Sequence, residues 1–231
     1  MGSTYGTLET QMLNFMGNPT DDTTTKAMLM ASFNWFQHIL SLRADWDELQ
    51  TYSLKPLTSG TYMYHITSSW SLNDLRKIYS IKLFDGTRYF SPMDYVTPRK
   101  WDEMAAPTIH FGNAKPEFYT RRGNYIIFNR KADASLSVEI WYFKYPTAVA
   151  STASVIDFPT NLDSALCSMA IGMTYLGMEE LQAAAKWMQI GSGMFKEQGF
   201  DMKTVVDMKA FSNIDHPITD YWSDPFQKEN P

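Results

Sequence analysis

The longest amphipathic pattern in the chain runs from Asp157 to Gln198. Apolar side chains recur there every three or four residues and a polar stripe lies opposite them, a period that predicts α-helix. Gly177 suits a helix C-terminus, and Glu179 and Glu180 suit the first turn of a new helix. We therefore predict two antiparallel helices with a break near Gly177. The small residues at 183–185, 191 and 193 would let neighbouring helices approach closely.

A short helix is predicted at residues 4–16 and a second, longer one from about Thr24 to Ala44, where Asp21 and Asp22 offer N-caps. The longer helix carries two apolar stripes and little polar surface. One stripe contains Ala27, Ala31, Trp35, Ile39 and Leu42, and the other contains Leu29, Phe33, Phe36 and Leu40. A helix that is apolar round most of its circumference is buried on more than one side. We expect it in the middle of a bundle or against another subunit.

Between residues 47 and 146 the pattern changes to strands. Strands are predicted at residues 52–56, 61–66, 76–84 and 87–90, with Asp85-Gly86 as a hairpin turn between the last two. A helical segment is predicted from Ser91 to about Ala105, interrupted near Pro98. Residues 124–129 and 135–145 are predicted to form a further hairpin. In its second strand Leu136, Val138, Ile140 and Tyr142 alternate with Ser137 and Glu139.

This order of elements predicts an α+β fold, with a four-helix bundle formed by the N- and C-terminal helical pairs, a β-rich insertion and an extended C-terminal tail. The bundle would comprise residues 1–46 and 157–206, and the insertion residues 47–146. The tail, residues 207–231, has aromatic side chains among prolines and acidic residues and shows neither a helical nor a strand period.

Composition narrows the class of protein. The chain has 231 residues and a formal net charge of −5, so no basic surface predicts nucleic-acid binding through phosphate neutralisation. The only cysteine, Cys167, excludes an intramolecular disulfide and a cysteine-based zinc site. No apolar run approaches the ~20 residues of a membrane span, and the N-terminus lacks a signal-peptide pattern. These features predict a soluble intracellular protein.

Candidate chemistry is sparse, and we predict no catalytic residue, no cofactor and no metal. The histidines form no metal-type pair, and Cys167 has no nearby base to stabilise a thiolate. Carboxylates at Asp45, Asp102 and Glu179 belong to acidic clusters that helix ends and solvated surface explain. Arg121 and Arg122 are the best candidates for contact with an anion or with DNA, although adjacent arginines in a turn more often face solvent or a subunit salt bridge.

The order of segments resembles the head-to-tail adaptor (connector) proteins of tailed bacteriophages. The resemblance rests on an opening helical pair that ends Leu42-Arg43-Ala44-Asp45-Trp46 and on a Gly-Thr…Tyr strand entry in Thr58-Ser59-Gly60-Thr61-Tyr62. The middle segment matches in Ser91-Pro92 with the helix through Trp101 and Met104, in Lys115-Pro116-Glu117-Phe118-Tyr119 and in Gly123-Asn124-Tyr125-Ile126-Ile127-Phe128. Ser137 to Tyr145 resembles the strand before the final helical pair. The sequence departs from the family pattern at Asn129-Arg130-Lys131, where many relatives have a proline-containing turn, and in its longer, aromatic tail.

The resemblance implies a structural virion protein of the neck, assembled in the host cytoplasm. Copies would form a ring, a dodecamer in the family, that binds the portal protein, continues the channel for genomic DNA without sequence-specific binding, and docks the next adaptor, stopper or tail protein, with no membrane involved. The tail would dock in the portal through Phe211, Ile214, Tyr221, Trp222 and Phe226, and the subunit interface would use Leu29, Phe33, Phe36 and Leu40. The alternatives are another neck or tail-completion protein, a hydrolase that uses an acidic cluster, or a monomeric binding module.

Overall fold

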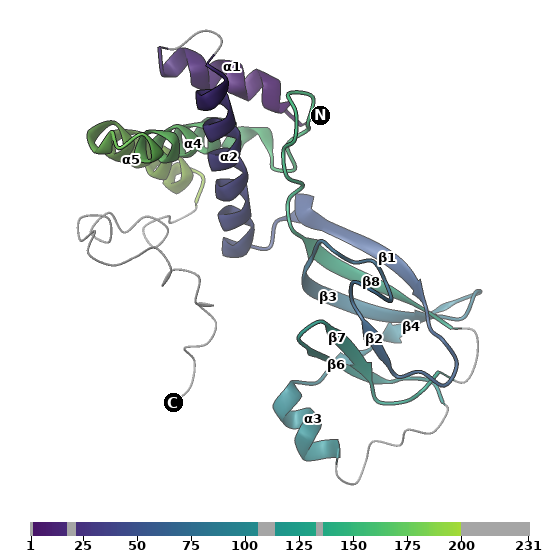
Figure 1. Cartoon of the computed structure of the whole chain (residues 1–231). Coiled ribbons are helices and arrows are strands. Elements are labelled where there is room, and N and C mark those ends of the chain that lie inside the picture. The colour runs from purple at the N-terminus through teal and green to yellow at the C-terminus, as the bar shows by residue number, and fades with distance from the viewer. Residues whose placement is uncertain (1, 18–21, 106–113, 133–135, 200–231) are drawn as a thin grey trace. The chain divides into compact units, whose positions relative to one another are not determined.

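A computed structural model describes residues 2–17, 22–105, 114–132 and 136–199 (Figure 1). The chain divides into two compact units. One consists of Met1–Ile39 with Val149–Pro231 and is helical in its described part, and the other is Leu40–Ala148 and carries the strands. The predicted tail, residues 207–231, lies outside the described residues.

The helical unit contains the predicted antiparallel pair, α4 (Asp163–Gly177) and α5 (Leu181–Glu197). The break is confirmed, and Glu179, with a φ of 63°, makes the sharp turn between the two helices. Two glycines bring the helices together. A Cβ on Gly172 would lie 2.7 Å from Met188 Cγ, and one on Gly191 would lie 2.7 Å from Met169 Cγ. Met188 of α5 therefore packs against α4 at Gly172, and Met169 of α4 packs against α5 at Gly191.

The other helices of this unit are α1 (Tyr5–Phe15) and α2 (Thr23–Arg43), whose last turn belongs to the second unit. Asp22 caps α2 as predicted: the Thr24 amide donates to its carboxylate over 2.9 Å. The hydroxyl of Thr25 also donates to Asp22. Its hydrogen bond is the largest cause of the lowered pKa of Asp22, and the bond from the Thr24 amide is the second. The first amides of α1 are satisfied differently, because Tyr5 N and Gly6 N donate to carbonyls of Ser154 and Thr152.

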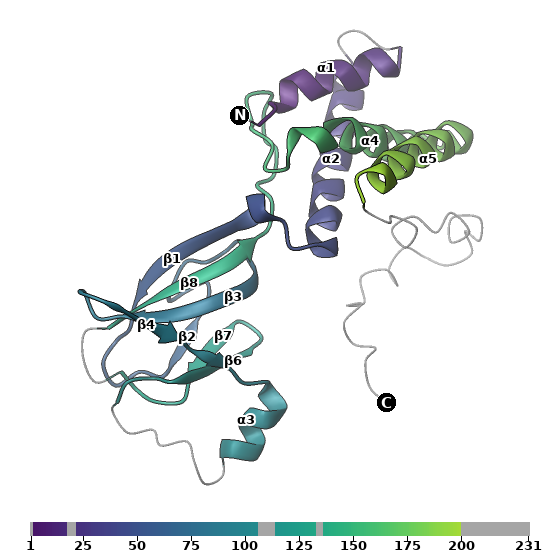
Figure 2. The same ribbon diagram turned by 180° about the vertical axis from the view of Figure 1, so that it is seen from behind.

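The predicted four-helix bundle is wrong. Within the described residues the chain has five α-helices and two four-stranded sheets, and one helix, α3 (Pro98–Ala105), lies in the strand-containing unit. Figures 1 and 2 show α2 crossing α4 and α5 instead of running alongside them. An apolar stripe shows that a helix is buried on that side, whereas the crossing angle depends on how the ridges of both partners fit. The sequence pattern therefore predicted the helices without their arrangement.

After the last turn of α2, the second unit contains the 3₁₀ turn η1 (Asp47–Leu49) and two sheets. The first has the order β1-β8-β3-β4, with β1 (Gln50–Pro56), β8 (Ser137–Lys144), β3 (Leu75–Phe84) and β4 (Tyr89–Pro92). The second has the order β2-β7-β6-β5, with β2 (Met63–His65), β7 (Tyr125–Phe128), β6 (Phe118–Arg122) and β5 (Asp94–Tyr95). All pairs are antiparallel except β5 with β6.

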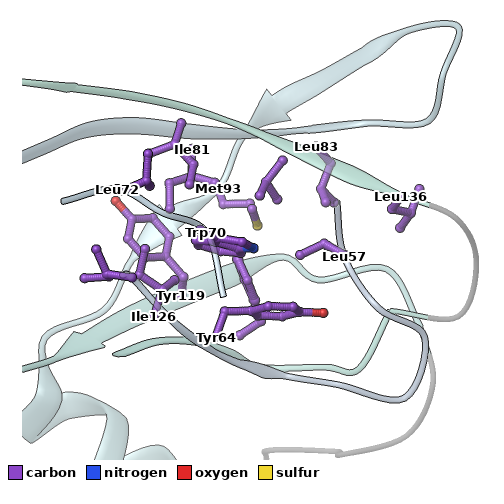
Figure 3. Packing of buried hydrophobic residues seen from close by; sticks show 14 of the residues in the cluster. Leu57, Tyr64, Trp70, Leu72, Ile81, Leu83, Met93, Tyr119, Ile126 and Leu136 are labelled. Carbon is purple, nitrogen blue, oxygen red and sulfur yellow. The ribbon is translucent and has the colours of Figure 1, made fainter. Parts of the chain in front are cut away.

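The core of this unit draws on both sheets and the segments beside them (Figure 3). The alternation predicted for residues 136–142 is confirmed, because Leu136, Val138, Ile140 and Tyr142 are all buried. Trp70 stacks on Tyr64 with ring centroids 4.8 Å apart, and the Tyr64 hydroxyl accepts the Thr58 amide at 2.8 Å. The rest of the cluster is aliphatic or aromatic: Leu57, Ile66, Leu72, Leu75, Ile81, Leu83, Met93, Tyr119, Ile126, Phe128 and Ala132.

Two local predictions in this unit are corrected by strand pairing. Residues 124–129 and 135–145 do not form a hairpin with each other, since β7 pairs with β2 and β6 while β8 pairs with β1 and β3. The hairpin partner of β7 is β6, joined through Gly123-Asn124 with Gly123 at a φ of 55°. The predicted helix from Ser91 begins only at Pro98, because residues 89–92 and 94–95 are strands.

Candidate interaction surfaces

Helix α2 presents two different apolar sides. Leu29, Phe33, Phe36 and Leu40, the residues predicted for a subunit interface, have 0% exposure within the single chain. Phe33 meets Tyr5 of α1 with centroids 5.4 Å apart, and Phe36 meets Phe195 of α5 at 5.7 Å. These side chains fill the core of the subunit itself.

The other stripe of α2 faces outward. Ala27, Ala31 and Trp35 are exposed, with Trp35 at 38%, and Ile39 is half-buried. We call these four residues the exposed stripe of α2. Its surface is the apolar side of α2 that the described part of the chain leaves accessible.

The first sheet of the strand-containing unit has an unusual outer face, opposite its core. Paired residues of antiparallel strands share a face, so Tyr52 and Leu54 of β1 lie beside Trp141 and Glu139 of β8. On β3 and β4, Phe84 lies beside Tyr89. Tyr52, Leu54 and Tyr89 are 59%, 47% and 53% exposed. A face that usually carries polar side chains here carries several aromatic ones as well as Glu139 and Lys82.

The aromatic groups of this outer face are held in place by one another and by one carboxylate. Tyr52 stacks on Trp141 with centroids 5.1 Å apart, and Phe84 meets Tyr89 at 4.7 Å. Trp141 Nε1 donates to Glu139 Oε1 over 2.6 Å. A hydrogen bond from the Tyr89 hydroxyl to Glu139 raises the pKa of Tyr89, with burial and the negative charge of Glu139 as further causes. The face is therefore ordered before any partner arrives.

The sequence contained a signal for this surface. Along β8 the buried residues alternate with a second set, which runs from Ser137 and Glu139 to Trp141 and Phe143. Together with Tyr52 and Leu54 at the same spacing on β1, that second set predicts an apolar outer face. Assigning the two sets to one surface required the β1–β8 pairing, which the sequence does not show.

Arg121 and Arg122 are occupied by partners within the chain. Arg121 donates through Nε to the Gly123 carbonyl at 3.2 Å and through Nη1 to the Arg76 carbonyl at 3.2 Å. Arg122 donates to the Pro98 carbonyl at 3.3 Å and forms an ion pair with Asp102. Both side chains thus fasten β6 to its surroundings, and Arg122 remains partly accessible.

The groups considered for chemistry lie in separate structural settings. Asp45 pairs with Arg76 at 2.7 Å and with Lys77; partial burial is the largest single influence on its pKa, and the hydrogen bonds and charges of the two cations outweigh it and lower that pKa. Asp102 belongs to α3 and Glu179 to the turn between α4 and α5. Burial, followed by the charge of Asp163, raises the pKa of the Cys167 thiol to about 12.

Two further properties concern the described residues alone. They contain no group of three or more His, Cys, Asp or Glu side chains placed to hold a metal ion. None of their helices has the length and apolar character needed to cross a membrane. The aromatic residues predicted for portal docking, Phe211, Ile214, Tyr221, Trp222 and Phe226, lie outside the described part of the chain.

The family model described as SU10 adaptor protein matches residues 3–209. The chain belongs to the SU10 adaptor family. The resemblance to phage head-to-tail adaptors is thereby confirmed. No curated protein matches the sequence significantly.

Membership assigns this adaptor a structural role in a bacteriophage, in the neck of the virion and in contact with other head or tail proteins. The match spans both compact units, so neither the helical nor the strand-containing unit is an addition to the family fold.

Proposed function

We propose that copies of this adaptor assemble into a ring beneath the portal, continue the DNA channel and provide the docking surface for the next neck or tail protein. One observation carries the ring: α2 leaves a second apolar side exposed after its first side has filled the subunit core. In a homo-oligomeric ring each subunit offers two different patches to its two neighbours. The exposed stripe of α2 would be one of them.

The ring interface therefore uses α2, although with other residues than Leu29, Phe33, Phe36 and Leu40, whose burial inside the chain leaves them unavailable. Trp35 is the largest side chain of the exposed stripe and the one suited to anchor in a neighbour, since tryptophan is enriched among binding hot spots. Genomic DNA would pass through the ring without gripping it, because a net charge of −5 favours sliding over binding. Arg121 and Arg122 remain candidates for weak phosphate contact.

Attachment to the portal would use the tail, with Phe211, Ile214, Tyr221, Trp222 and Phe226 filling pockets of the portal. We expect truncation after Asp207 to weaken co-sedimentation with purified portal while the helical circular dichroism signal stays the same. Equal attachment by the truncated and full chains would contradict the role of the tail.

The ring is tested with Trp35→Asp in the presence of purified portal. A carboxylate at the centre of an apolar contact is strongly unfavourable, so we expect the variant to fold as a monomer and to form no portal-bound ring. Leu181→Asp is the matched control, because Leu181 is an apolar residue 52% exposed at the start of α5 and an acidic side chain suits that position. A Trp35→Asp protein that still forms rings on the portal would refute α2 as the interface. If even the unaltered chain formed no complex with portal, a role at another level of the neck or tail would replace the adaptor ring.

A further inference from the structure

The free edge of β1 is the strongest candidate for a binding site other than the proposed ring interface. β1 ends the order β1-β8-β3-β4, so only one of its sides is paired. Within the described residues, residues 51–56 of β1 make main-chain hydrogen bonds to β8 alone, and the Gln50 amide donates to the Asp47 carbonyl. In an antiparallel pair every second residue of an edge strand directs its N–H and C=O away from the partner strand. The unpaired carbonyls of this row and its free amides, to which Pro56 and Gln50 add none, are a template for another strand.

The side chains of β1 define what such a strand must look like. Tyr52 and Leu54 lie on the aromatic outer face, 59% and 47% exposed. Thr51, Ser53 and Lys55 share the opposite face, since they pair with Tyr142, Ile140 and Val138. Lys55 makes no ion pair with a described residue. A strand laid along this edge would therefore place apolar side chains beside Tyr52 and Leu54 and an acidic side chain beside Lys55.

We propose that the β1 edge binds an extended segment of another protein, about seven residues long, with apolar side chains alternating with polar ones and an acidic residue among the latter. The segment joins the sheet as a fifth strand through main-chain hydrogen bonds, and its apolar side chains extend the outer face. This proposal depends on the strand-containing unit alone and stands whether or not the proposed ring forms.

Two other occupants fit the edge less well. A nucleic acid could stack on aromatic side chains, but Tyr52 already stacks on Trp141, and Glu139 opposes the charge of Lys82, its partner across β3 and β8. The other edge strands of the described residues are β4, β2 and β5, with four, three and two residues, so they cannot pair along the whole of β1 in a second copy. Pairing of β1 with β1 would make a closed two-fold dimer.

The test uses the full chain and a synthetic nine-residue peptide in which Val and Thr alternate and one central Thr is replaced by Glu. Two further versions carry N-methyl groups on one or the other set of alternate amides. Because only one set faces β1, we expect one methylated version to lose binding and the other to retain it, measured by fluorescence anisotropy. Hydrogen exchange should slow at alternate amides of β1 in the complex.

Variants of β1 locate the site. Tyr52→Ala and Leu54→Ala should each weaken binding at least about fivefold, the size of a modest hot spot. Lys55→Glu should weaken binding of the Glu-containing peptide and strengthen binding of a version with Lys at the same place. Tyr79→Ala is the matched control, because Tyr79 is 66% exposed in the same sheet but lies on β3, away from the edge. It should change affinity by less than about twofold.

Any of three results would overturn the proposal. The first is an absence of peptide binding up to about millimolar concentration. The others are equal effects of the two methylation patterns and a Tyr79→Ala effect as large as that of Tyr52→Ala. Displacement of the peptide by single-stranded DNA would assign the face to nucleic acid. A dimer in sedimentation that Tyr52→Ala dissociates would assign the edge to a second copy. Protection of β1 in the free chain that disappears on truncation after Asp207 would assign it to this chain's own tail.

Discussion

The contact between α4 and α5 can be tested with two glycines of the same helix. Gly191 is buried, and a Cβ there would lie 2.7 Å from Met169 Cγ and 3.2 Å from Met169 N. Gly193, two residues further along α5, is exposed, and a Cβ there would have no atom within 4 Å. Both positions are helical, so replacing either glycine with alanine changes the backbone preference in the same way. The two variants therefore differ mainly in the contact between the helices.

The expected magnitudes follow from two opposing effects. Alanine is favoured over glycine inside a helix by about 1 kcal/mol, so Gly193→Ala should raise the free energy of unfolding by about that amount. At Gly191 the same gain is opposed by overpacking, which costs roughly 1–3 kcal/mol, since the new methyl group would lie 2.7 Å from Cγ and Sδ of the buried Met169 side chain. The two variants should differ by about 1–3 kcal/mol, with Gly191→Ala the less stable.

The measurement is urea unfolding followed by the helical circular dichroism signal. A Met169→Ala background supplies a second check, because removing the methionine side chain opens space for the new methyl group. There the difference between Gly191→Ala and Gly193→Ala should shrink by most of its size, since the two sites are directly coupled. If Gly191→Ala stabilised the chain as much as Gly193→Ala in the unaltered background, the close approach of α4 and α5 at Gly191 would be refuted.

Further predictions concern α2 and the buried thiol. Phe33→Ala should lower the free energy of unfolding by about 3–5 kcal/mol and Trp35→Ala by about 1 kcal/mol or less, because only Phe33 is buried; similar urea midpoints would contradict the assignment of the two stripes. Asp22→Ala should lower the melting temperature by removing the cap of α2. Because the pKa of Asp22 is lowered on folding, its contribution is present above the unfolded pKa of about 3.9 and is lost as pH falls through the folded value, so the difference between variant and parent should vanish in acid. Cys167 should react with a thiol reagent at neutral pH only after unfolding, because burial raises its pKa to about 12; rapid labelling of the native chain would contradict this.

Local patterns predicted the individual elements well where they were strong. The break near Gly177, the cap at Asp22 and the buried alternation from Leu136 to Tyr142 depend on residues close in sequence, and the structure confirms them. The Gly123-Asn124 turn between β6 and β7 is a hairpin signal of the same local kind, although the predicted hairpin joined other segments. These features are determined within a few residues.

Pairing between distant segments could not be predicted in the same way. The hairpin expected from residues 124–129 and 135–145 was wrong, because β7 and β8 belong to different sheets. Alternation along a strand shows which of its sides is buried. It does not identify the strands that pair with it, since any apolar strand of suitable length can do so. The four-helix bundle failed for the same reason, as each helix showed its buried stripe and none showed its crossing angle.

Helix α2 shows most clearly which features the sequence determines and which ones the tertiary structure determines. Its two apolar stripes were readable from spacing alone, because a helix repeats every 3.6 residues whatever surrounds it. The tertiary structure decided which stripe fills the subunit, by placing Tyr5 against Phe33 and Phe195 against Phe36. The exposed stripe of α2 and the aromatic face beside β1 are what remained after the core was complete. Local patterns indicate the apolar residues of these surfaces, and only the packing of the other segments decides that those residues stay accessible.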